Sequence, residues 1–184
     1  MSSGLPLAGK VTLIHQSLRE AGIPHAIGGA MALAYYGEPR LTVDIDVNVF
    51  VTTDELSEVL EVLEAVGVDA NVDPEVARRN GQVYLRWGRN PVDVFFAYDP
   101  FHEAMSRRTR TVPFGEGTIP ILAPEHLIVC KAAFDRTKDW IDIEQMLAGV
   151  ENLDREELDL WLDRVLGPES KATRRVQRLW DQTR

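Results

Sequence analysis

Hydrophobic and polar positions along the chain follow two different periods, which predicts a protein that mixes helices and strands. In residues 11–21 and 54–66 apolar residues recur every three or four positions, the spacing of one face of a helix. In residues 41–51 β-branched residues alternate with polar ones, and residues 92–97 form a short apolar run. We therefore expect an α/β (α+β) fold with a mixed sheet flanked by helices.

The same patterns, with glycine and proline as stop signals, set the expected elements. We expect helices at 11–21, 30–36, 54–66, 101–105, 124–134, 136–148, 154–166 and 169–182, and strands at 25–27, 41–51, 82–87, 92–97, 109–113 and 118–122. Turns at 88–90 and 114–117 predict two hairpins. Pro120 predicts that the last strand lies at a sheet edge, because proline has no N–H to donate.

The strand at 41–51 carries the first candidate chemistry. Side chains two positions apart share a face of a strand, so Asp44 and Asp46 point the same way while Ile45 and Val47 point into a core. Two ionised carboxylates on one face repel each other, and a hard divalent cation is the simplest compensation. The expected cofactor is Mg²⁺.

Asp93 lies inside the apolar run at 92–97, where an uncompensated charge is costly. If this strand lies beside the one that holds Asp44 and Asp46, the three carboxylates meet. They could then hold two metal ions about 3.5 to 4 Å apart, as in sites of phosphoryl transfer.

Gly28 and Gly29 stand between the short strand at 25–27 and an alanine-rich helix. Glycine permits a tight turn and a close approach of the backbone, and free N–H groups of a first helical turn bind phosphate. We expect these two residues to bind the polyphosphate of a nucleotide.

These residues resemble the pattern of the nucleotidyltransferase superfamily, which has a palm like that of DNA polymerase β. The pattern is a hydrophobic residue, Gly, then Gly or Ser, followed by Asp-x-Asp in a strand and a third acid on a later strand. In this sequence the matching residues are Ile27, Gly28, Gly29, Asp44, Asp46 and Asp93. Position 29 is Gly rather than Ser, which removes a hydroxyl group.

Two further segments resemble small bacterial members of that superfamily, the AbiEii-like or minimal nucleotidyltransferase branch. They are the linker 36–42 and the helical segment 127–142, whose matching residues are Lys131, Arg136, Lys138, Asp139 and Asp142. The resemblance covers about residues 10–148. It implies a palm at residues 1–122, a C-terminal helical lobe at 123–184, and an NTP as substrate.

Several charged residues have two interpretations. Lys131 either forms a solvated ion pair with Asp135, four positions on, or reaches the nucleotide, as the resemblance implies. Arg40 either binds phosphate or pairs with Glu38. Asp139 and Asp142, three positions apart on one flank of a helix, either orient Lys131 or Arg136 or act as a base on the acceptor. The four histidines lack the paired spacing of a zinc site, and Cys130 on an apolar face is expected to be an unreactive packing residue.

Composition narrows the class of protein. Hydrophobic residues make up 45% and charged residues 27% of the chain, as in ordinary globular proteins. One cysteine, no long apolar segment and no signal-like start predict a cytoplasmic protein with no membrane association. The net charge of −9 argues against non-specific coating of nucleic acid. Basic residues nevertheless concentrate at 78–110 and 171–184, which forms either an RNA-binding surface or solvated helix faces.

The expected function is magnesium-dependent transfer of a nucleoside monophosphate from an NTP to an acceptor, with release of pyrophosphate. Resemblance to the AbiEii-like branch implies a toxin of a toxin-antitoxin pair that modifies tRNA or a protein, with a cognate antitoxin as partner. Two alternatives stay open: an adenylyltransferase of the aminoglycoside type, and a non-catalytic nucleotide-binding or antitoxin protein.

The carboxylate assignment predicts that Asp46→Asn abolishes nucleotidyl transfer while the protein still folds, because the change removes charge at nearly constant volume. Circular dichroism and pyrophosphate release measure the two properties. An Asp46→Asn protein that keeps metal-dependent activity would contradict the assignment.

Overall fold

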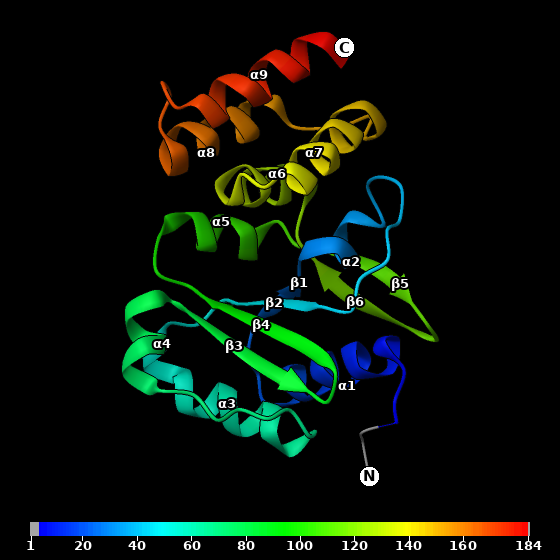
Figure 1. Cartoon of the computed structure of the whole chain (residues 1–184), viewed down its shortest axis with the longest axis vertical. Coiled ribbons are helices and arrows are strands. Elements are labelled where there is room, and N and C mark those ends of the chain that lie inside the picture. The colour runs from blue at the N-terminus through cyan, green and yellow to red at the C-terminus, as the bar shows by residue number, and fades with distance from the viewer. Residues whose placement is uncertain (1–3, 184) are drawn as a thin grey trace.

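A six-stranded mixed sheet forms the centre of the computed structural model, which describes residues 4–183 (Figure 1). The strand order across the sheet is β3-β4-β2-β1-β6-β5. The strands are β1 His25–Ile27, β2 Ile45–Val49, β3 Gln82–Trp87, β4 Asn90–Phe96, β5 Arg110–Phe114 and β6 Gly117–Ile121. The pairs β1–β2, β3–β4 and β5–β6 are antiparallel, whereas β2–β4 and β1–β6 are parallel.

Helices cover both faces of this sheet (Figure 1). They are α1 Leu7–Glu20, α2 Gly29–Leu33, α3 Leu56–Ala65, α4 Pro74–Asn80, α5 Pro100–Arg107, α6 Pro124–Phe134, α7 Thr137–Gly149, α8 Arg155–Leu166 and α9 Lys171–Thr183. Helices α1 and α3 lie on one side of the sheet, and α6 lies on the other, with α7, α8 and α9 beyond it. None of the helices in residues 4–183 is both long enough and apolar enough to cross a membrane.

The alternation in β2 and β4 decides which face of the sheet is core. Ile45, Val47, Val92 and Val94 are fully buried, and they belong to the same hydrophobic cluster as Ile14 of α1. The intervening residues of both strands face the side of the sheet on which α6 lies. The predicted core positions Ile45 and Val47 are confirmed, whereas Leu41 and Val43, in the first part of the expected strand, are exposed.

Lys10 fixes the position of the β3–β4 hairpin. This lysine of α1 is 2% exposed, and its Nζ donates hydrogen bonds of 2.8 Å to the Trp87 carbonyl oxygen and to Asn90 Oδ1. The Asn90 amide in turn donates to the Val43 carbonyl oxygen at 2.8 Å. One buried ammonium group therefore links α1, the start of β4 and the segment that enters β2.

The hairpins at 88–90 and 114–117 and the mixed α and β class are confirmed. Helix α4 was not predicted, although its signals are present: the Asp73 side chain caps it, Pro74 begins it and Gly81 ends it with φ of +64°. Two elements are shorter than expected. Strand β2 begins at Ile45 rather than at residue 41, and helix α2 ends at Leu33 rather than at residue 36.

The prediction that Pro120 places its strand at an edge is wrong, because β6 lies between β1 and β5. The register pairs β1 with β6 only at Ile27 and Ile121, so little of that side of β6 carries a hydrogen-bond ladder. The division into a palm at 1–122 and a helical lobe at 123–184 stays a prediction. Helix α6 does begin shortly after β6 ends, and one hydrophobic cluster includes residues from both parts.

Replacing Lys10 by Met leaves the Asn90 side chain and the Trp87 carbonyl oxygen without a buried donor, and we expect a loss of about 2 to 3 kcal/mol in the free energy of unfolding. Urea denaturation measures this loss. The control is Arg19→Met on the exposed part of the same helix, which we expect to change the free energy by less than about 0.5 kcal/mol. Equal effects of the two changes would contradict the bridging function of Lys10.

Candidate active site

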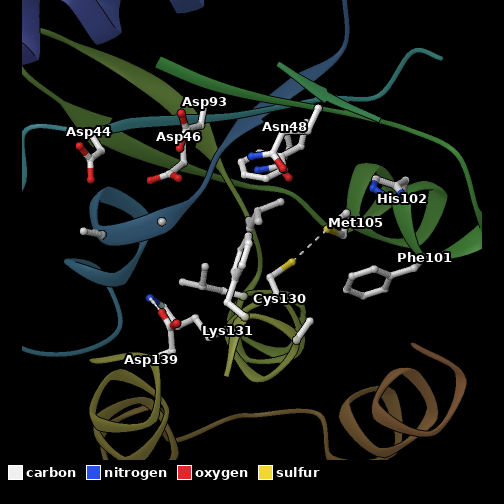
Figure 2. A pocket seen from close by; sticks show the side chains of 18 of the residues that line it. Asp44, Asp46, Asn48, Asp93, Phe101, His102, Met105, Cys130, Lys131 and Asp139 are labelled. Carbon is white, nitrogen blue, oxygen red and sulfur yellow. Dashed lines mark hydrogen bonds and ion pairs between the residues drawn. The ribbon is translucent and has the colours of Figure 1, made fainter. Parts of the chain in front are cut away.

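Three carboxylates gather on the face of the sheet that is turned toward α6 (Figure 2). In the parallel pair β2–β4, Asp46 lies directly beside Asp93 in the register. Asp44 precedes β2 by one residue and belongs to the same alternating face. The prediction that the strand of Asp93 lies beside the strand of Asp46 is confirmed.

The carboxylates share a face but do not form a closed cage of ligands. Among residues 4–183, no three His, Cys, Asp or Glu side chains lie close enough together to hold a metal ion as they stand. The Asp46 carboxylate is turned against Gly29, where a Cβ atom would overlap its Oδ2. Three carboxylates nonetheless supply the oxygen ligands that a hard divalent cation takes, so the donor set fits Mg²⁺.

Burial and mutual repulsion disfavour the ionised form of two of these acids. Burial, then the Asp44 charge, raises the pKa of Asp46, and the cationic side chains Lys131 and Arg136 offset part of that rise. Burial and the Asp46 and Asp44 charges raise the pKa of Asp93 to about 6. Folding thus holds negative charge in a place where it is unfavourable without a cation, which is typical of a functional site.

Gly28 and Gly29 lie against β2. The Gly28 N–H donates to the Asp46 carbonyl oxygen at 2.9 Å, and a Cβ atom on Gly28 would lie 2.8 Å from Asn48 Nδ2. Gly29 has a φ of +55°, a conformation that residues with side chains rarely adopt. Close contact with the acidic strand therefore requires both glycines, independently of any phosphate.

Across from the acids, Lys131 and Arg40 contact a single carboxylate. Lys131 Nζ lies 2.7 Å from Asp142 Oδ2, and Arg40 Nη2 lies 3.3 Å from the same oxygen. Lys131 is 4% exposed and Asp142 is 2% exposed. The alternatives of a solvated Lys131–Asp135 pair and an Arg40–Glu38 pair are therefore wrong. Asp135 instead ends α6 in a left-handed conformation and accepts a hydrogen bond from Trp140 Nε1.

Asp139 forms a similar ion pair with Arg136. The Arg136 Nε donates to Asp139 Oδ2 at 2.6 Å, and Lys131 Nζ lies 3.9 Å from Asp139 Oδ1. The carboxyl group of Asp139 is fully buried, whereas the Arg136 side chain is half-exposed. Both Asp139 and Asp142 are thus engaged with basic side chains, which favours the interpretation that they orient Lys131, Arg136 and Arg40.

One cavity of about 310 Å³ joins the two sides. Gly29, the three acids, Arg40, Lys131, Arg136 and Asp139 all line it. Cys130 also lines it, and burial raises the pKa of its thiol to about 12, in agreement with an unreactive cysteine.

Several polar residues that line this cavity were not predicted from the sequence. Asn48, Tyr98, Asp99 and His102 extend it beyond the acids toward α5. Asn48 could have been found, because it stands two positions after Asp46 on the same face of β2. His102 is one of the four histidines left unassigned because they lack the paired spacing of a zinc site. Its proximity to the cavity depends on where α5 packs.

Known structures share this fold. They include the lincosamide antibiotic adenylyltransferase LnuA bound to lincomycin (13% identity, 75% of this chain and 94% of that chain, TM-score 0.54). A protein from H. pylori that was assigned as a nucleotidyltransferase gives 15% identity over 95% and 90% of the chains, with a TM-score of 0.53. ANT(2'')-Ia in complex with adenylyl-2''-tobramycin gives 16% identity over 96% and 95%, with a TM-score of 0.50.

At such low identity these structures establish the fold alone, which is that of the nucleotidyltransferases, as the sequence predicted. Residues 16–177 match the family described as nucleotidyl transferase AbiEii toxin, type IV toxin-antitoxin system. The chain belongs to this family and is an NTP-dependent nucleotidyltransferase. No match was found among curated proteins.

The raised pKa of Asp93 predicts that Asp93→Asn stabilises the metal-free protein. The folded form holds this proton more tightly than the unfolded form does, so the stability of the wild-type protein falls as pH rises from about 4 through about 6. Allowing for solvent screening, we expect Asp93→Asn to be more stable by about 1 to 2 kcal/mol at pH 7.5, with no difference below about pH 4.

Thermal unfolding in the presence of EDTA at these two pH values checks this prediction. The matched control is Asp163→Asn, an exposed carboxylate on α8. A wild-type protein more stable than Asp93→Asn at pH 7.5 would show that the acids are not in mutual repulsion.

Proposed function

We propose that the protein transfers a nucleoside monophosphate from an NTP to a tRNA or protein acceptor in a Mg²⁺-dependent reaction. The observation that carries this proposal is the single cavity, in which three carboxylates from β2 and β4 face a buried lysine from α6. Asp44, Asp46 and Asp93 are the proposed metal ligands. Gly28, Gly29, Arg40 and Lys131 are the proposed contacts of the nucleotide.

The proposed division of tasks follows the chemistry of these side chains. A divalent cation, when bound, supplies positive charge that offsets the acids and the polyphosphate. Lys131, fixed by Asp142, donates to a phosphate oxygen as negative charge develops on it. Asp93 is the side chain proposed to take up the proton of the attacking hydroxyl group.

Basic residues near the cavity support an anionic acceptor. Arg136 and Lys138 line the cavity and are exposed. A neighbouring groove, which shares Asp135 and Trp140 with the α6–α7 region, is lined by four basic residues of α9. They are Lys171, Arg174, Arg175 and Arg178. An acceptor such as tRNA carries the complementary charge, so we favour RNA over protein.

The family of the chain supports action as the toxin of a toxin-antitoxin pair, with a cognate antitoxin as partner. The cytoplasm is the proposed location. An antibiotic acceptor is the second candidate, because two proteins of the same fold were crystallised with lincomycin and with adenylyl-2''-tobramycin. The mixed charge of the cavity gives little preference for a polycationic aminoglycoside.

A labelling experiment identifies the acceptor. The purified protein is incubated with Mg²⁺, each labelled NTP in turn, and total cellular RNA, total cellular protein or an aminoglycoside, and pyrophosphate release is followed. Label in RNA is the expected result. Label in protein or in the antibiotic alone would replace the RNA assignment, and NTP binding without pyrophosphate release would contradict catalysis altogether.

Lys131→Met is expected to lower the rate of transfer by about 10²- to 10³-fold, because it removes the donor to the developing charge. Asp142→Asn, which keeps Lys131 but removes its anchor, is expected to have a smaller effect. The control is Arg107→Met on the exposed surface of α5, with activity unchanged. Equal activity of Lys131→Met and the wild-type protein would contradict the proposed function of Lys131.

A further inference from the structure

The half of the cavity away from the acids has two buried polar side chains with unused hydrogen-bonding capacity. Asn48 and His102 are each 6% exposed and line the cavity. Within residues 4–183 the Asn48 side chain makes no hydrogen bond, and His102 uses only Nδ1. The fully buried polar atoms that lack a partner do not include any atom of Asn48 or His102. The Asn48 amide and His102 Nε2 are therefore accessible from the cavity.

Asp99 fixes the orientation of the His102 ring and the tautomer of its neutral form. Its Oδ1 accepts the Phe101 and His102 backbone N–H groups, which caps α5, and lies 2.7 Å from His102 Nδ1. A neutral imidazole that donates from Nδ1 to a carboxylate has its proton there, so Nε2 is an acceptor. The Tyr98 ring packs against the imidazole with centroids 4.4 Å apart, which further limits its rotation.

Most of the remaining wall is apolar or aromatic, with polar groups added by the less buried Asn80, Gln82 and Tyr98. The apolar and aromatic residues are Phe95, Phe101, Met105, Leu127 and Phe134. Figure 2 shows the acids at one side of the cavity and His102 and Met105 at the other, with Asn48 between them. An apolar slot with a few directional polar groups fits a planar heterocycle. Asn48 stands two strand positions after Asp46, about 7 Å away along β2, so such a ring would lie beyond the phosphates.

We propose that this half of the cavity binds the nucleobase of the NTP and selects adenine and cytosine, which carry an amino group where guanine and uracil carry a carbonyl oxygen. This inference rests on the proposed function. Adenine and cytosine present an amino N–H donor beside a ring-nitrogen acceptor, whereas guanine and uracil present a carbonyl oxygen beside a ring N–H. The Asn48 amide alone does not discriminate between these bases, because it matches either pattern when its amide group rotates by about 180°. Where it faces the exocyclic position, the His102 Nε2 acceptor accepts from the amino group of adenine or cytosine and meets the carbonyl oxygen of guanine or uracil as a second acceptor.

The test compares ligands that differ in one group. Dissociation constants are measured by calorimetry with Mg²⁺ for ATP and inosine triphosphate, in which a carbonyl replaces the adenine amino group, and for CTP and UTP. We expect ATP and CTP to bind about tenfold more tightly than their carbonyl counterparts. Inorganic tripolyphosphate reports the phosphate half of the cavity separately.

His102→Gln supplies an amide side chain, which can rotate to donate or to accept a hydrogen bond as that of asparagine does. We expect it to narrow the ratio of the ATP and inosine triphosphate constants to below about threefold while tripolyphosphate affinity is unchanged. A change that merely disturbed α5 would weaken both nucleotides equally. The matched control is His15→Gln, a histidine outside the cavity, which keeps the wild-type ratio.

The outcomes separate this inference from the proposed function. Equal binding of ATP and inosine triphosphate, with tripolyphosphate still bound, overturns base selection and leaves the proposed function standing. Loss of transfer in His102→Gln at an unchanged ratio overturns it as well and assigns this half to the acceptor. If neither tripolyphosphate nor any NTP binds, both proposals are wrong.

Discussion

Parallel pairing of β2 with β4 sets two carboxylates side by side, and the arrangement of the site follows from their repulsion. The register places Asp46 beside Asp93, with Asp44 on the same face. Strong burial on the opposite face, where Ile45 and Val47 are fully enclosed, prevents either strand from shifting by one residue to separate the charges. The hydrophobic core thus holds the acids together against their mutual repulsion.

On the opposite side of the cavity, basic side chains balance this negative charge, and ion pairs hold these side chains in place. Asp142 holds Lys131 and Arg40, while Asp139 holds Arg136. Long basic side chains normally lose conformational freedom when they bind phosphate, and anchoring them beforehand lowers that cost. Asp139 and Asp142 also neutralise part of the positive charge of these basic side chains. The site therefore combines preorganised donors with a moderate rather than strong attraction for anions.

The cavity divides into an acidic half near β2 and β4 and a largely apolar half beside α5, whose polar residues include Asn48, Asp99 and His102. One strand serves both halves, because Asp46 and Asn48 are successive residues on the same face of β2. Small changes at the position of Asn48 or in α5 would therefore alter what the enzyme accepts without disturbing the acids. Such separation is one way in which a shared fold carries different specificities.

The amino-acid sequence by itself determined the fold class, the two hairpins and the common face of Asp44 and Asp46, because strand periodicity and turn residues act locally. It also contained the signals for α4, which the sequence analysis overlooked. Only the tertiary structure decided that Lys131 pairs with Asp142 rather than Asp135, that β6 is interior, and that His102 lines the same cavity as Asp46. Those outcomes depend on how α5, α6 and α7 pack against the sheet, and contacts between residues far apart in the chain leave no periodic signal in it.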